Sequence, residues 1–232
     1  MAGAKPDGQG GPHVFVDDLD ALALDADDEH HLARVIRLRD GDALTASDGA
    51  GAWRSCVFRG SSLEAVGDIV HCASPTPPIG VGFALIKGGR PELVVQKLTE
   101  LGVDYLVPIT CARSVVRWDD AKAAKNQVRL AKVAREAAMQ SRQVRVPVVH
   151  PLESFAAASA RPGATLGERD GAAPSLDHPF ALIGPEGGWS DAERGVELAH
   201  TRLGDSVLRA ETAAIAVATL LSAVRSQLWG RH

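Results

Sequence analysis

Hydrophobic and polar positions follow two different patterns before and after the proline-rich stretch at residues 73–78. From His13 to His71 the apolar runs are short and are separated by Gly, Asp and Ser, which is typical of small strands joined by turns. The stretch DDEHHLARVIRL instead places Leu32, Val35 and Ile36 in helical register. This part of the chain therefore predicts a small, mostly β domain with one helical piece.

The proline-rich stretch ASPTPP is typical of a linker, because its prolines fix φ and remove hydrogen-bond donors. Beyond it, strand-like and helix-like segments alternate, which predicts a parallel sheet with helices on its faces. The expected division is a flexible tail over 1–12, a β domain over 13–73 and an α/β domain over 74–232. The expected segments are VGFALI, PELVVQKLTELG, YLVPIT, a long helix from Asp119 to Arg142, VPVV, FALIGP, DAERGVELA and ETAAIAVATLLSAVRSQLW.

Composition narrows the class of protein. Of the 232 residues 45% are apolar, so the chain is expected to fold, and its net charge of -4 does not by itself indicate nucleic-acid binding. Cys56, Cys72 and Cys111 form no C-x-x-C pair, which argues against a disulfide framework or a cysteine zinc site and fits a reducing cytoplasm. The first residues lack the apolar core of a signal peptide, and the apolar run 213–224 is too short to cross a bilayer.

A glycine-rich turn carries the first chemical signal. FALIGPEGGWSDAER is an apolar strand, a turn and a helix opened by Ser190, with Glu193 placed to complete a capping box. It matches neither a Walker loop nor a dinucleotide fingerprint, and Glu186 would repel a phosphate. The turn suits a neutral or cationic ligand; taken alone, a tight turn without any ligand explains it equally well.

A second glycine turn follows in RLGDSVLRAETAAIAVATLL. The pair GPEGGWS and LGDSVLRAETA resembles the RsmE family of ribosomal RNA methyltransferases, which belong to the SPOUT class. KGGRPELVVQKLTELGV, RSVVRW and HLARVIRLRDGD extend the resemblance in the family's order. It covers nearly the whole chain after residue 12.

The resemblance implies a fold and an activity. We expect an N-terminal PUA-like β-barrel, which would bind RNA, followed by a C-terminal SPOUT α/β trefoil-knot domain with a parallel sheet. Family members use S-adenosylmethionine to methylate N3 of a uridine in the decoding region of 16S ribosomal RNA, and they act as homodimers. The expected partners are therefore 16S rRNA or the assembled small ribosomal subunit, and a second copy of the chain.

The resemblance also implies site residues. A glycine-rich wall can hold the cofactor without steric cost, and Gly187 is expected to press against it. Arg209 is the candidate stabiliser of charge on the uracil oxygens, and Glu211 is a candidate base, although a role at the helix N-terminus fits it as well. The candidate cofactor-binding residues are Leu166, Gly184, Pro185, Glu186, Gly187, Gly188, Leu203, Gly204, Val207, Leu208 and Arg209.

Basic residues supply candidate RNA contacts. On the long helix, Lys122, Lys125, Arg129, Lys132 and Arg135 share one side, which is either a solvated face or an RNA-binding one. The expected core-facing stripe on the other side is Ala121, Ala124, Val128, Ala131 and Ala138. The candidate RNA-binding residues are Arg34, Arg37, Lys125, Arg129, Lys132 and Arg142. His30 and His31 diverge on a helix, so no metal is expected.

The chain departs from the family pattern at two positions. Met139 stands where the family commonly has Glu, and Gly89 where it often has an acid. Two other functions stay open, a non-catalytic RNA-binding protein with this fold, or methylation of transfer-RNA ribose. The final segment, 211–229, is apolar on nearly every side, which predicts that a second copy of the chain covers part of it.

Overall fold

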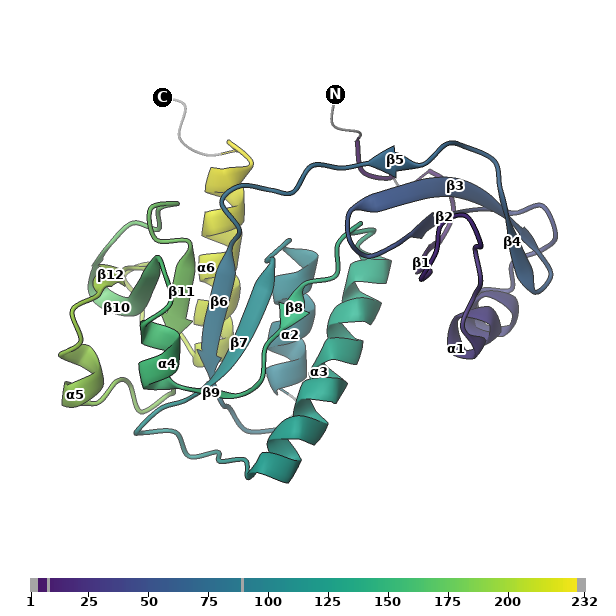
Figure 1. The fold of residues 1–232 in the computed structure, drawn as a ribbon. Helices are drawn as coiled ribbons and strands as arrows, with labels where there is room; N and C mark the ends of the chain where they lie inside the picture. The colour runs from purple at the N-terminus through teal and green to yellow at the C-terminus, as the bar shows by residue number, and fades with distance from the viewer. Residues whose placement is uncertain (1–3, 8, 89, 229–232) are drawn as a thin grey trace. The chain divides into compact units, whose positions relative to one another are not determined.

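The computed structural model describes residues 4–7, 9–88 and 90–228 and forms two compact units. The first runs to Ser74 and takes in Ala138–Val146; the second holds Pro75–Ala137 and the chain from Pro147 onward. Figure 1 traces the elements of each unit along the chain. The flexible tail and the final helix expected from the sequence include residues 1–3, 8 and 229, which lie outside the described residues.

The first unit is built on a five-stranded mixed sheet, in which β1 runs parallel to β2 and the other pairs are antiparallel. Leu32, Leu44 and Phe58 are among its fully buried side chains. The strands are β1 (His13–Phe15), β2 (Ala43–Ser47), β3 (Ala52–Arg59), β4 (Ser62–Ala65) and β5 (Val70–His71). This arrangement confirms the predicted β domain.

The helical piece of the first unit changes type along its length. A short α-helix, α1 (Ala26–His30), continues as a π-helix, η1 (His31–Ile36). The wider π turn moves side chains away from α-helical register. Leu32 is buried, whereas Val35 is 61% exposed and Ile36 41% exposed, so the three do not share one buried face.

Residues 138–146 pack with the first unit, although the sequence predicted them inside a domain over 74–232. Met139 packs against the core of the first unit. The backbone amide of Val146 donates to Gly49 O at 3.0 Å, and the Ser47 hydroxyl donates to Val144 O at 3.2 Å. A methionine suits position 139 because a glutamate there would bring a carboxylate against apolar side chains.

The second unit contains a seven-stranded sheet in which every pairing is parallel, as the alternation of strands and helices predicts. The strand order is β12-β10-β11-β6-β7-β8, with β9 also beside β7. The strands are β6 (Gly80–Ala84), β7 (Tyr105–Thr110), β8 (Val148–Val149), β9 (Glu153–Ser154), β10 (Ala164–Ala172), β11 (Phe180–Ile183) and β12 (Ala199–Thr201).

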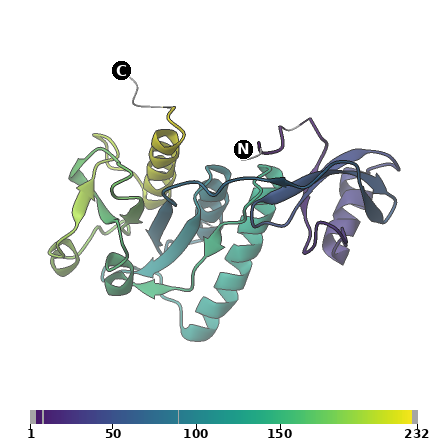
Figure 2. The ribbon, with the colours of Figure 1, turned by 45° about the horizontal axis from the view of Figure 1, so that its top comes forward.

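Helices cover this sheet and enclose its core. One core cluster joins α2 and α6 to the sheet through side chains such as Val94, Leu98, Val217 and Leu221, and a second cluster lies under α4. Figure 2 shows the backbone of these helices beside the sheet. The helices are α2 (Arg90–Glu100), α3 (Asp120–Gln140), α4 (Phe155–Ser159), α5 (Asp191–Arg194) and α6 (Ala210–Arg225). No helix among the described residues is long and apolar enough to span a bilayer.

The long helix α3 buries a different side from the one expected. Four members of the expected core-facing stripe are exposed, and only Ala138 is buried. Alanine buries little apolar surface, so a stripe made mainly of alanines fixes the helix rotation weakly. The larger Leu130 is fully buried and sets the rotation instead. The members that stay outside the core are Ala121, Ala124, Val128 and Ala131, and the residues buried in their place are Asn126, Leu130, Ala134 and Ala137.

Candidate functional site

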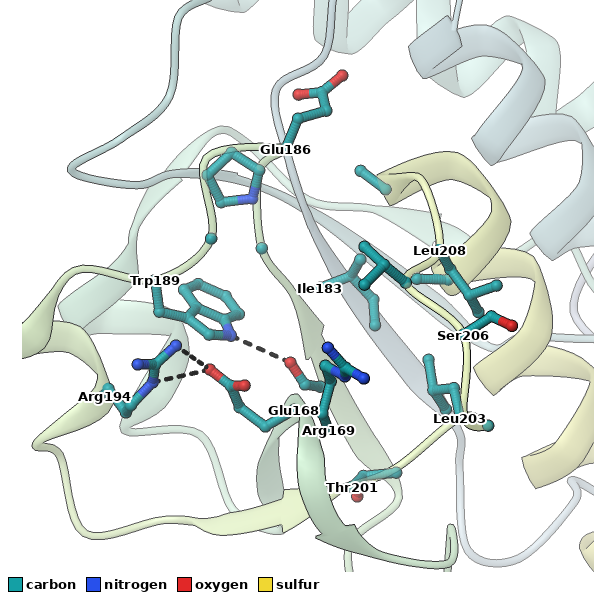
Figure 3. Close-up of a pocket in the computed structure, with 18 residues that line it drawn as sticks. Glu168, Arg169, Ile183, Glu186, Trp189, Arg194, Thr201, Leu203, Ser206 and Leu208 are labelled. Atoms are coloured by element: carbon teal, nitrogen blue, oxygen red, sulfur yellow. Dashed lines mark hydrogen bonds and ion pairs between the residues drawn. The ribbon is translucent and has the colours of Figure 1, made fainter.

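The second unit holds a cavity of about 240 Å³ beside β10, β11, β12 and the first turn of α6 (Figure 3). Both glycine turns noted in the sequence form its walls. Its lining residues are Gly167, Glu168, Arg169, Ile183, Gly184, Pro185, Glu186, Gly188, Trp189, Arg194, Thr201, Leu203, Gly204, Ser206, Val207, Leu208, Ala210 and Ala213.

The structure brings most of the candidate cofactor residues together around this cavity. Those that line it are Gly184, Pro185, Glu186, Gly188, Leu203, Gly204, Val207 and Leu208. Leu166, Gly187 and Arg209 do not. Leu166 is fully buried in the core, and Arg209 is an exposed side chain at the N-cap of α6. A Cβ on Gly187 would meet the Cβ of Arg113 at 3.3 Å, so that glycine accommodates Arg113 instead of lining the cavity.

Trp189 forms one wall, and the backbone around it leaves room for its ring. Its indole is 2% exposed and donates from Nε1 to Gly167 O at 3.2 Å, which ties the turn to β10. A Cβ on Gly184 would lie 3.0 Å from the indole ring. A glycine is needed at 184 because a side chain there would push the ring out of its place.

A buried carboxylate holds the helix that follows the turn. Ser190 and Glu193 form the predicted capping box, and Glu193 Oε1 also accepts from the Ala112 amide at 2.7 Å. Arg113 Nη1 donates to Trp189 O at 2.8 Å, so a second loop supports the same turn. Burial alone would raise the pKa of Glu193. The hydrogen bonds from Ser190 and Ala112 and the charge of Arg113 outweigh burial and hold that pKa below its ordinary value.

Charged side chains outside the sequence-based candidates complete the cavity and its edge. Two nitrogens of Arg194 contact Glu168 Oε1 at 3.0 and 2.9 Å. Arg90 lies 3.4 Å from Glu186 and 3.6 Å from Glu211, so it links the first glycine turn to α6. Arg90 stands in KGGR, which the resemblance includes, and Arg194 stands in SDAER, just after the first glycine turn. Their pairing, however, depends on segments far apart in sequence.

Glu211 differs from the other acids of the site. Its side chain is 14% exposed, and its Oε2 is buried without a hydrogen-bond partner among the residues that the structure describes. A buried carboxylate oxygen with no donor is costly, and such atoms are found where a ligand or water supplies the missing partner. Glu211, which does not itself line the cavity, is therefore the acid beside it that has an unfilled acceptor position among the described residues.

The candidate RNA-binding residues fall into two groups. Lys125, Arg129 and Lys132 are exposed on α3 within the second unit. Arg129 also forms an ion pair with Glu92 at 2.7 Å, which gives it a structural role between α3 and α2. Arg34, Arg37 and Arg142 belong to the first unit, where Arg37 and Arg142 have φ values of 62° and 54°.

Two family models match the chain. A model described as RNA methyltransferase domain matches residues 73–222, and one described as RNA methyltransferase PUA domain matches residues 24–65. The second falls within the first unit, and the first spans the parallel sheet and the cavity.

Named relatives and solved structures agree with these matches. Ribosomal RNA small subunit methyltransferase E of Mycobacterium tuberculosis is 34% identical over 236 residues, which cover 91% of this chain and 90% of that protein. The enzyme of the same name from Bacillus subtilis is 34% identical over 60% of this chain and 57% of its own length. The crystal structure of the Neisseria gonorrhoeae protein of that name, bound to S-adenosyl methionine, is 26% identical with a TM-score of 0.74, covering 92% of this chain and 97% of that one.

Replacing Glu193 by Gln tests the hydrogen bonds through which its carboxylate holds the turn. The carboxylate stabilises the fold fully above its ordinary pKa of 4.5, and this contribution is lost as pH falls through the lower folded value. We expect Glu193→Gln to lower the free energy of unfolding at pH 7 by about 2 kcal/mol and to flatten its pH dependence below 4.5. Urea unfolding from pH 7 to 3 measures both. Glu197→Gln, an exposed neighbour, is the control and should change neither; an unchanged pH profile in Glu193→Gln would contradict this role.

Proposed function

The chain belongs to the ribosomal RNA small subunit methyltransferase E family, and from this premise we propose that it methylates N3 of a uridine in the decoding region of 16S ribosomal RNA. It is an RNA methyltransferase with S-adenosylmethionine as its methyl donor. The observation that supports the proposal is that both glycine turns of the resemblance form the walls of one cavity.

The cavity fits the chemistry of this donor. Ile183, Leu203 and Leu208 supply an apolar wall for a purine, and Glu168 and Glu186 place negative charge near a cationic ligand. Bound S-adenosylmethionine supplies a methyl group activated by its sulfonium. Methyl transfer needs positioning above all, and the hydrogen bonds that hold Trp189 and Glu193 provide a rigid wall for it.

The chain's own residues would then deprotonate the uracil and stabilise the charge that forms on it. Its imide must lose the N3 proton, and negative charge grows on the neighbouring oxygens. We propose Glu211 as the acceptor of that proton, supported by its buried, unpartnered Oε2. Arg209, exposed at the start of the same helix, is proposed to stabilise the charge on the oxygens.

An assay on purified 16S rRNA tests the reaction and the base together. Mass spectrometry of the digested product should find 3-methyluridine at one decoding-region position. We expect Glu211→Gln to lower kcat by roughly 10²–10⁴-fold, the usual contribution of a general base, while the affinity for S-adenosylmethionine changes little. A methyl group on ribose would contradict the proposed N3 target, and an undiminished kcat would remove Glu211 from the mechanism.

RNA binding is proposed for the basic side of α3 and for Arg34, Arg37 and Arg142 of the first unit. The support on α3 is that Lys125 and Lys132 are exposed on one helix, where they can reach phosphates. The match of the first unit to an RNA methyltransferase PUA domain supports the other group.

Salt dependence separates phosphate binding from a merely solvated face. Substituting Lys125 and Lys132 by Ala should weaken RNA binding and reduce the slope of log affinity against log salt by about one for each phosphate that the variant no longer binds. Fluorescence anisotropy at several salt concentrations measures the slope. Lys97→Ala is the control, since Lys97 is paired with Glu100 at 2.8 Å. A slope equal to that of the unmodified protein would leave this face without a role in binding.

We also propose that the protein is a homodimer that uses α6. One side of this helix is buried in its own unit, whereas Ile215, Ala216, Leu220 and Val224 are only partly covered. Partly covered apolar side chains on a helix are a surface that a two-fold partner would cover.

Light scattering tests the dimer directly. The unmodified protein should have twice the 24.3 kDa mass of one chain. Leu220→Glu should reduce the mass to one chain, because an unpaired charge buried in an interface costs roughly 3–5 kcal/mol. Ser61→Glu, in an exposed turn of the first unit, should leave the mass unchanged. A fully active monomer at micromolar concentration would contradict the proposal.

A further inference from the structure

One cation that lines the cavity of the second unit has no acid partner among the described residues. Glu168 and Glu186 line it, and each is already paired with an arginine, Arg194 and Arg90. Arg169 lines it too, and no described residue forms an ion pair or a hydrogen bond with its guanidinium. Since the other charges have partners inside the protein, Arg169 is the cation left for a ligand.

The local backbone explains why Arg169 points into the cavity. In a regular strand, successive side chains face opposite sides of the sheet, so 168 and 169 would not share a cavity. The pairing of β10 with β12 is irregular between Gly167 and Ala172. Such irregularities re-aim side chains. Residues 167–169 consequently all line the cavity, and Figure 3 shows the Arg169 guanidinium among the labelled side chains of the lining.

We propose that Arg169 binds the carboxylate of the methionine moiety of the methyl donor, an inference that rests on the proposed function. A guanidinium matches a carboxylate through paired, charge-assisted hydrogen bonds. S-adenosylmethionine carries a purine, a ribose, a sulfonium, an ammonium and a carboxylate, and only the carboxylate is an anion. Arg169 is therefore expected to bind the end of the ligand that carries the carboxylate.

The other walls agree with this orientation. Ile183, Leu203 and Leu208 form the apolar part of the lining. Two nitrogens of Arg194, Nε and Nη2, contact Oε1 of Glu168. The other carboxylate oxygen, Oε2, takes no part in this ion pair and can accept a hydrogen bond from the ligand's ammonium. The purine would contact the apolar wall, and the amino-acid end would contact residues 168 and 169.

Calorimetry with two ligands that differ only in the carboxylate tests the assignment. The unmodified protein should bind decarboxylated S-adenosylmethionine roughly tenfold to a hundredfold more weakly than S-adenosylmethionine, as expected for loss of a hydrogen-bonded ion pair. Arg169→Ala should bind both ligands with nearly the same affinity, and Arg169→Lys should recover part of the difference. Arg202→Ala is the matched control: Arg202 is exposed and outside the cavity lining, and it should keep the full preference.

The outcomes separate this inference from the proposed function. If the unmodified protein binds neither ligand, the proposed function fails and the inference fails with it. If it binds both equally, the proposed function stands and Arg169 has no carboxylate to hold. If Arg169→Ala weakens both ligands by the same factor, or weakens only RNA binding, the arginine serves the fold or an RNA phosphate, and the inference is overturned.

Discussion

The hydrogen bond from the Trp189 indole to Gly167 O is the contact on which the site depends. It ties the turn after β11 to the neighbouring strand β10 and makes the indole a wall of the cavity. It requires a glycine at 184, where the ring lies against the backbone. Two further hydrogen bonds support the same turn. Arg113 donates to the carbonyl oxygen of Trp189, and the carboxylate of Glu193 accepts from the amide of Ala112. The wall is therefore fixed by the protein before a ligand arrives, which favours catalysis by positioning.

Charge pairing holds the acids of the same cavity in place. Each acid that lines it forms an ion pair with an arginine from another segment. Arg90 extends this network to Glu211, whose second carboxylate oxygen lacks a partner among the described residues. A buried carboxylate oxygen without a donor is costly, which supports the proposal that Glu211 accepts a proton from the substrate. Arg169 and Glu211 are the two groups proposed to gain a partner when the ligands bind.

Local pattern explains which parts of this arrangement could be predicted from the sequence. Alternating apolar segments predict the parallel sheet, and the two glycine turns around GPEGG and LGDS predict eight of the eighteen residues that line the cavity. The parts that could not be predicted depend on distant packing. The rotation of α3 is set by Leu130 and not by the alanines, and residues around Met139 join the first unit because of contacts with strands far earlier in the chain. The alternation of side chains along a strand could not place Arg169 at the cavity, because an irregular pairing of β10 turns it there.

Hydrogen exchange with and without S-adenosylmethionine tests whether this cavity binds the methyl donor, because it reports on every segment of the chain at once. Amide exchange should become slower in the three segments that form the walls, residues 167–169, 183–189 and 201–213, with little change in the first unit. Protection concentrated elsewhere, for example on α3 or in the mixed sheet, would contradict the assignment of this cavity as the methyl-donor site.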